Sequence, residues 1–326
     1  MKTVLAALGL AALAAVGAVL YLLFRKPAAA AAPGIKVEIT PARLERGKYL
    51  FEVLGHCDSC HSPRDFTKFA GPVISGLQGQ GHVMPPELGL PGTVVAPNIT
   101  PDVETGIGSW TDGEKIRAIR EGISKDGRAL FPMMPYQFYR SMSDEDAHAL
   151  VAFMNTLPAK KNPLPRSKLN FPVNVLIKGA PQPVGSAPHP DRNNRLEYGK
   201  YLVTVGACAE CHTQEGGGKL NKDLLFAGGR EFRIGPYLVN SANITPDPET
   251  GLGSWSEERF IAKFNGFRSF DGGSAPAASQ ANFTIMPWIG MSRLHEDDLR
   301  AMYAYLRTVP AKQNAVTVHP EYAPSN

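Results

Sequence analysis

The pattern of hydrophobic and polar positions begins with one long apolar run. Val4 to Phe24 are 21 consecutive residues without a charged side chain. As a helix they would span roughly 31 Å, enough to cross a bilayer core. A cleaved signal peptide is the alternative, because the alanines at 28–32 offer small residues to a protease. The length of the run, and the Arg25-Lys26 pair between it and those alanines, favour an uncleaved membrane anchor.

Beyond a tether at residues 28–40, apolar positions recur with helical spacing. Gly47, Leu50, Phe51 and Leu54 fall on one face of a helix predicted to begin near Pro41. Residues 62–97 have no clear period and many glycines and prolines, which indicates a long loop. The 32 glycines and 28 prolines of the whole chain suit a helical but loop-rich protein.

Two further helices are predicted in this half by their N-terminal capping residues. Thr111 with Glu114 has the spacing of a capping box, and Ser143 is followed by Asp146 at the third helical position. Pro158 ends the second of these helices. Its apolar stripe consists of Ala147, Leu150, Val151, Met154 and Leu157.

The second half of the chain repeats the first. Gly199-Lys200-Tyr201-Leu202 restates the residues at 47–50, and residues 243–247 restate the Asn-Ile-Thr-Pro-Asp segment at 98–102. Residues 249–255 likewise restate 104–110. Such colinear agreement predicts a duplicated domain. The final apolar stripe recurs 152 residues further on, as Leu299, Met302, Tyr303, Leu306 and Val309.

Each half contains one Cys-x-x-Cys-His motif, at residues 57–61 and 208–212. This is the attachment pattern of c-type haem, in which two cysteines bind the porphyrin and the histidine binds iron. Cys57, Cys60, Cys208 and Cys211 are thus predicted to hold two covalent haem c groups. A dithiol, zinc site or disulfide scaffold is less fitting, because all four cysteines lie in the motifs and each second cysteine is followed by histidine.

His61 and His212 therefore become the predicted proximal iron ligands. On the other side of each iron, the repeat nominates Met134 and Met286, each followed by proline and separated from its histidine by 73 and 74 residues. Methionine more often fills gaps in a core, so this assignment depends on the repeat. The remaining histidines have no counterpart in the other half and are interpreted as surface or loop residues, with His82 the strongest rival: His56, His82, His148, His189, His295 and His319.

Two more pairs of repeated residues are candidates for contacts around the haem. Trp110 and Trp255 each end a repeated polar loop, and their indole N–H groups would either reach a haem propionate or simply pack against the porphyrin or the loop. Asn98 and Asn243 would hold either loop backbone or a propionate. The sequence leaves both alternatives open.

Charge adds little to this picture. The net charge is +4, but Lys2, Arg25 and Lys26 flank the first apolar run, and each haem would add two propionates. The rest of the chain is therefore close to neutral. No basic patch indicates nucleic-acid binding.

With these motifs in hand, the chain resembles the cytochrome c subunits of membrane-bound bacterial alcohol, gluconate and sugar dehydrogenases. The shared features are G-K-Y-L before C-x-x-C-H, the N-I-T-P-D…E-T-G-x-G-x-W loop, and M-P-[YW], each present twice. The resemblance implies two helical cytochrome c domains with His/Met ligation, their first and last helices crossing where Gly47 meets the face of Leu150, Val151 and Met154. The best-known dehydrogenase subunits carry three haem motifs, whereas this chain has two.

The predicted protein is mainly α-helical and carries electrons; it is not itself an enzyme. It would pass electrons from a dehydrogenase or respiratory partner to quinone, another cytochrome or an oxidase, from the periplasmic side of a bacterial inner membrane held by a single N-terminal pass. An integral subunit of a respiratory or photosynthetic complex and a dihaem peroxidase-like enzyme with one open iron are the alternatives. The predicted parts are an anchor or signal (1–27), tether (28–40), domain 1 (41–160), proline-rich linker (161–191), domain 2 (192–313) and tail (314–326).

Overall fold

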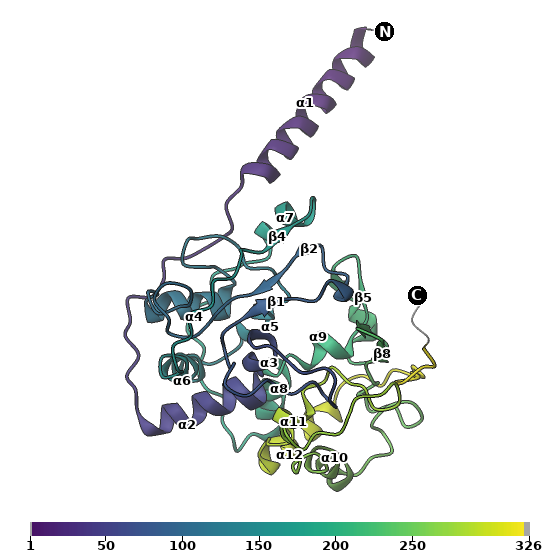
Figure 1. Cartoon of the computed structure of the whole chain (residues 1–326). Coiled ribbons are helices and arrows are strands. Elements are labelled where there is room, and N and C mark those ends of the chain that lie inside the picture. The colour runs from purple at the N-terminus through teal and green to yellow at the C-terminus, as the bar shows by residue number, and fades with distance from the viewer. Residues whose placement is uncertain (1, 323–326) are drawn as a thin grey trace.

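The computed structural model describes residues 2–322, so the predicted tail is described only as far as residue 322. Helix α1 (Lys2–Phe24) projects away from a body of helices, short strands and long loops (Figure 1). Two hydrogen bonds connect the end of α1 to the body. Arg25 Nη2 donates to the carbonyl oxygen of Leu176 (3.2 Å), and Lys178 Nζ donates to that of Leu23 (2.7 Å).

The N-terminal segment requires a correction to the sequence prediction. Across residues 2–322, none of the helices is both sufficiently long and sufficiently apolar to cross a membrane. The predicted single N-terminal pass through an inner membrane is therefore wrong.

Five helices form the first half of the body, called domain 1. The helix predicted near Pro41 begins there, but it changes at Leu50 into a π-helical turn that the Gly55 N–H closes on the carbonyl of Leu50 (2.8 Å). The capping box of Thr111 and Glu114 is present as predicted, because both of its hydrogen bonds form. The domain 1 helices are α2 (Pro41–Tyr49) with its π-helical extension (Leu50–Leu54), α3 (Cys57–His61), α4 (Asp112–Glu121), α5 (Tyr136–Tyr139) and α6 (Asp144–Met154).

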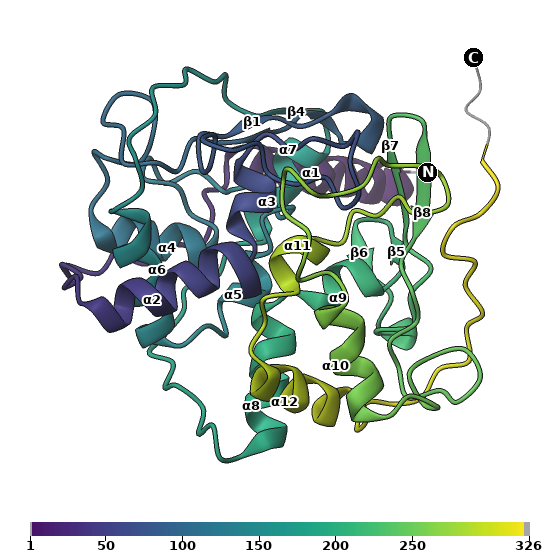
Figure 2. The same ribbon diagram turned by 60° about the horizontal axis from the view of Figure 1, so that its bottom comes forward.

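Domain 2 repeats these helices in the same order, and the two sets lie side by side (Figure 2). In each domain the first and last helices pack together, α2 on α6 and α8 on α12. One buried hydrophobic cluster runs through both domains and includes Phe51, Leu150, Leu202 and Leu299. The domain 2 helices are α8 (Arg195–Val205), α9 (Cys208–His212), α10 (Glu257–Asn265), α11 (Trp288–Met291) and α12 (Glu296–Leu306).

Strands are short and occur as four antiparallel pairs. The pairs are β1 (His82–Val83) with β3 (Val95–Ala96), β2 (Gly92–Thr93) with β4 (Lys168–Leu169), β5 (Glu215–Gly216) with β6 (Lys219–Leu220), and β7 (Glu231–Ile234) with β8 (Tyr237–Asn240). Pairing of β2 with β4 fixes part of the predicted linker on domain 1, in agreement with a linker laid along the surface. Helix α7 (Val173–Leu176) and 3-10 turns at Pro86–Leu88, Ile177–Gly179 and Lys222–Leu224 complete the described elements.

Glycine makes the close crossing of the first and last helices possible. A Cβ atom on Gly47 would lie 2.0 Å from the carbonyl oxygen of Ala149 and 2.7 Å from Cβ of Phe153. Gly199 meets the carbonyl oxygen of Ala301 in the same way, at 1.9 Å. The crossing of the two helices was predicted, but the face of the last helix that Gly47 contacts was predicted wrongly. Gly47 meets Ala149, whose small side chain allows the close approach. Leu150 and Met154 line an internal cavity instead.

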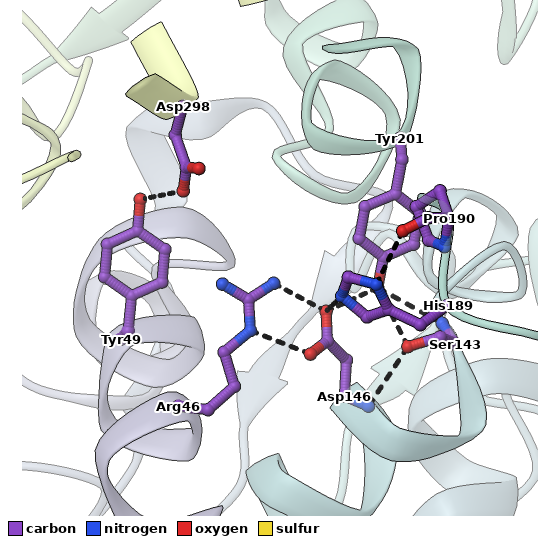
Figure 3. A network of polar contacts seen from close by, with 8 residues as sticks. All are labelled: Arg46, Tyr49, Ser143, Asp146, His189, Pro190, Tyr201 and Asp298. Atoms are coloured by element: carbon purple, nitrogen blue, oxygen red, sulfur yellow. Dashed lines mark hydrogen bonds and ion pairs between the residues drawn. The ribbon is translucent and has the colours of Figure 1, made fainter. Parts of the chain in front are cut away.

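The two domains exchange hydrogen bonds in a reciprocal pattern (Figure 3). Tyr49 of domain 1 donates its hydroxyl to Asp298 of domain 2 (2.6 Å), and Tyr201 of domain 2 donates to Asp146 of domain 1 (2.5 Å). Each tyrosine hydroxyl also accepts from the backbone N–H at the N-cap of the other domain's last helix. Because these groups are buried, the bonds hold the domains in one orientation.

Within residues 2–322, Asp146 has a cationic partner and Asp298 has none. Arg46 binds Asp146 through two nitrogens, at 2.7 and 2.8 Å (Figure 3). Burial acts to raise the pKa of Asp146, but the hydrogen bonds and positive charge of Arg46 outweigh it and hold that pKa below its usual value. At the position equivalent to Arg46, domain 2 has Tyr198, so Asp298 has no arginine there.

This asymmetry predicts unequal effects of two matched variants. Tyr49→Phe is expected to lower the free energy of unfolding by about 2 kcal/mol, because it takes a hydrogen bond from the buried carboxylate of Asp298. Tyr201→Phe should lower the free energy of unfolding by less, because Asp146 still binds Arg46. Urea unfolding of both proteins compares them, and an equal or larger loss for Tyr201→Phe would contradict the argument.

Candidate haem sites

One continuous cavity of about 1360 Å³ extends through both domains. Every residue predicted to hold haem lines it. The set comprises Cys57, Cys60, His61 and Met134 from domain 1, and Cys208, Cys211, His212 and Met286 from domain 2. All four cysteines are free of disulfide bonds, which argues against a disulfide scaffold. The folding of the chain therefore gathers two equivalent sets of potential haem ligands around one hollow.

The same backbone feature orients both cysteine pairs. The residue just before each motif adopts a left-handed conformation, with φ of 38° at His56 and 50° at Ala207. Such a conformation is costly for residues other than glycine and marks a place where the surroundings impose the turn. A single short helix then follows, α3 or α9, and it carries both sulfurs and the histidine of its motif to the cavity.

Both motif histidines are held through Nδ1. The Nδ1 atom of His61 lies 2.8 Å from the carbonyl oxygen of Pro97, and that of His212 lies 2.7 Å from the carbonyl oxygen of Ala242. When Nδ1–H donates to a carbonyl, Nε2 is left unprotonated and available for a metal. Burial lowers the pKa of both imidazoles, which favours this neutral form.

The two candidate methionines sit in loops of matching geometry. Tyr136 N–H donates to the carbonyl of Met134, and Trp288 N–H donates to that of Met286, both at 2.7 Å. In each case a short helix, α5 or α11, begins directly after the proline that follows the methionine. The equivalence of the two loops supports a shared role for Met134 and Met286.

The side-chain amides of Asn98 and Asn243 form hydrogen bonds within the protein through both their nitrogen and their oxygen. Asn98 Nδ2 donates to Thr105 Oγ1 and to the carbonyl of Lys160, while its Oδ1 accepts from the backbone and hydroxyl of Thr100. Asn243 makes the same bonds to Thr250, Lys312 and Thr245. This pattern favours the role of holding the loop over that of binding a propionate. Trp110 and Trp255 line the cavity, so both of their proposed roles stay open.

The other histidines lie in varied surroundings. His82, the strongest rival as a ligand, has both ring nitrogens near backbone carbonyls, those of Val83 (3.0 Å) and Cys60 (3.1 Å), and it does not line the cavity. His56 and His319 do line it. His295 stacks on the Tyr49 ring, and His189 lies 3.9 Å from Asp146 in the interface network.

Sequence reasoning missed three residues beside the motifs. Tyr139 is buried and donates its hydroxyl to the carbonyl of Gly55, two residues before Cys57 (2.9 Å). Arg64 and Arg230 both line the cavity and bond to segments near the motifs. Arg64 follows its histidine by three residues but Arg230 follows by eighteen, so the repeat gave no signal for the pair.

Comparison with known proteins identifies the family. The cytochrome c family model matches this chain twice, at residues 44–158 and 196–310. The chain belongs to the cytochrome c family. Its two domains are tandem cytochrome c domains, in agreement with the predicted duplication.

This cytochrome c is similar in sequence to several bacterial cytochromes. It is 33% identical to a dihaem cytochrome c-type protein of Cereibacter sphaeroides, over 82% of this chain and 86% of the relative. It is 32% identical to the cytochrome c subunit of a quinone-dependent alcohol dehydrogenase of Gluconacetobacter polyoxogenes, over 86% of this chain and 60% of the relative. The gluconate 2-dehydrogenase cytochrome c subunit of Pantoea cypripedii is 30% identical, over 85% and 62%. This cytochrome c spans about 60% of the length of the dehydrogenase subunits.

Two covalently bound haem c groups are the cofactors of this cytochrome c. The residues around the cavity fit them: four unpaired sulfurs, two histidines held with Nε2 available, and a lining that continues between both motifs. Burial raises the pKa of Cys208 and Cys211 to about 12, so both thiols are neutral before attachment.

Proposed function

We propose that this cytochrome c is an electron carrier that accepts electrons from a dehydrogenase and delivers them to quinone, another cytochrome or an oxidase. The observation that carries the proposal is the continuous cavity, which brings two equivalent histidine, cysteine and methionine sets into one hollow. Cytochrome c subunits of alcohol, gluconate and fructose dehydrogenases among its relatives support the choice of donor.

In this proposal the chain performs no bond chemistry. When bound, each haem supplies an iron that accepts and releases one electron. The residues of the chain would hold and tune that group: Cys57, Cys60, Cys208 and Cys211 would attach it, and His61 and His212 would bind iron through Nε2. Met134 and Met286 would complete the coordination. Methionine ligation raises the reduction potential and leaves no open position for a substrate.

Carbon monoxide tests whether the irons are closed. The reduced wild-type protein is expected to bind carbon monoxide slowly or weakly, because Met134 and Met286 would each provide a sulfur ligand to one iron. Met134→Ala should make one haem bind it rapidly, and Met286→Ala the other. Absorption spectra recorded after mixing follow the binding.

A neighbouring methionine provides the matched control. Met133 also lines the cavity and stands next to Met134, so Met133→Ala makes a similar change without removing the proposed ligand. It should behave as the wild type does. Rapid binding by the wild-type protein would contradict the carrier function and favour a peroxidase-like enzyme. Purification of the native complex and identification of its companion chains then tests the dehydrogenase donor.

A further inference from the structure

The two haem sites differ in the fixed charge beside their motifs. Arg64 follows the first motif, and its guanidinium donates to the carbonyls of Gly71 and Ala70, both at 2.6 Å. One of its nitrogens also lies 3.5 Å from the carbonyl of Ile285, the residue before Met286. These partners are neutral. In the part of the chain that the structure describes, no carboxylate forms an ion pair with Arg64, and the charge that acts on it from the first motif is that of Asp58.

Arg230 lines the cavity near the second motif, and its charge is balanced. It bonds to Glu210 Oε1 at 3.2 Å and to Glu215 Oε2 at 2.7 Å. Glu210 lies inside the second motif and lines the cavity with Arg230. Two carboxylates therefore surround one guanidinium at the second site.

Other charged groups near the cavity do not remove this difference. Asp58 lies inside the first motif, but burial and the nearby charge of Glu52 raise its pKa to about 7. Burial also raises the pKa of Glu210 in the second motif, so the difference between the two sites depends on Glu215, whose carboxylate binds Arg230. The ammonium group of Lys178 on the domain 1 side bonds to the carbonyl of Leu23 at an exposed position, and Lys263 on the domain 2 side is also exposed, so solvent screens both charges. The remaining charged residues of the lining are exposed or paired: Glu104, Lys115, Arg128 and Arg166.

Fixed charge acts directly on a redox centre. A positive charge opposes the ferric state of a nearby iron, which carries one more positive charge than the ferrous state, and so raises the reduction potential. Carboxylates act in the opposite direction, and both effects are strong where water is excluded. Histidine and methionine are the proposed ligands at both sites, so ligand identity does not compensate for the charges.

We infer that the haem of domain 1 has the higher reduction potential, so electrons enter the protein through domain 2 and leave through domain 1. This inference rests on the proposed carrier function and gives it a direction. Arg64 is then a residue that sets the potential of the first haem, and Glu210 and Glu215 are residues that lower that of the second.

Redox titration of the purified two-haem protein, followed by absorption, tests the order. Two one-electron transitions are expected. Met134→His and Met286→His each change the spectrum and potential of one haem, and thereby identify which transition belongs to which domain. The inference requires that Met134→His alters the transition at higher potential.

Three charge variants then test the cause. Arg64→Gln should shift the upper transition to lower potential, and Glu215→Gln should shift the lower transition upward. Lys200→Gln removes an exposed charge outside the cavity lining and should move neither. If Arg64→Gln does not fold, Glu215→Gln alone tests the cause. The Glu215 side chain is more exposed than that of its partner Arg230, so its replacement is expected to disturb the fold less.

The outcomes separate the inference from the carrier function. A higher potential for the domain 2 haem overturns the direction, and a Glu215→Gln transition that does not move overturns its cause, while both haems keep methionine ligation. Rapid carbon monoxide binding by the wild-type protein overturns the carrier function itself.

Discussion

Cys57→Ala/Cys60→Ala is expected to leave a chain with one covalent haem. Both sulfurs reach the cavity from α3, and the second motif reaches it separately from α9. Without the thioether bonds, the first haem is no longer tethered, while attachment at residues 208 and 211 continues. Mass spectrometry of the denatured protein measures the loss, and absorbance per chain should fall by about half.

The second motif supplies the matched variant. Cys208→Ala/Cys211→Ala should also leave one haem, this time in domain 1. Two haems retained by either double variant would contradict attachment through these cysteines. Complete loss from both variants would contradict the independence of the two attachment sites.

Gly47→Ala and Gly199→Ala are expected to destabilise the protein strongly, each by about 3 kcal/mol. The added methyl group would lie 2.0 or 1.9 Å from a backbone oxygen of the partner helix, and a backbone atom cannot rotate aside as a side chain can. The higher helix propensity of alanine, worth about 1 kcal/mol, offsets only part of this cost. Thermal and urea unfolding of the haem-loaded proteins measure the effect.

Gly185→Ala is the control for this pair. Its added methyl group meets no atom within 4 Å, and its backbone is not in the left-handed region. It should be neutral or slightly stabilising, because alanine restricts the unfolded chain. Gly47→Ala and Gly199→Ala proteins as stable as Gly185→Ala would show that the helices can separate at little cost.

Local chemistry explains what the sequence could predict. The cap at Thr111 and the helix start at Ser143 depend on residues three positions apart, and both have the predicted bonds. The duplication was visible because the same motifs recur in the same order. The family model confirms the two domains, and the relatives support two haem groups.

Contacts between distant residues could not be predicted in this way. Tyr49 and Asp298 are separated by 249 residues, and in the sequence Tyr49 is one position of a repeated motif with no visible partner. The face that Gly47 meets depends on which side of α6 borders the cavity. Arg64 and Arg230 do not form a repeated pair in the sequence, because they stand at different distances from their motifs. For the apolar run at the N-terminus, charge and length alone predicted a membrane pass that the structure contradicts.

The reciprocal tyrosine and aspartate bonds have a consequence for the origin of this chain. In an isologous dimer, residue i of one subunit contacts residue j of the other, and j contacts i. Tyr49 with Asp298 and Tyr201 with Asp146 follow that rule across one polypeptide. The contact between the two domains therefore has the symmetry of an isologous dimer interface, although it lies within one chain. Because both halves belong to one chain, they need not be identical, and Tyr198 in the place of Arg46 is a difference that no pair of identical subunits could hold.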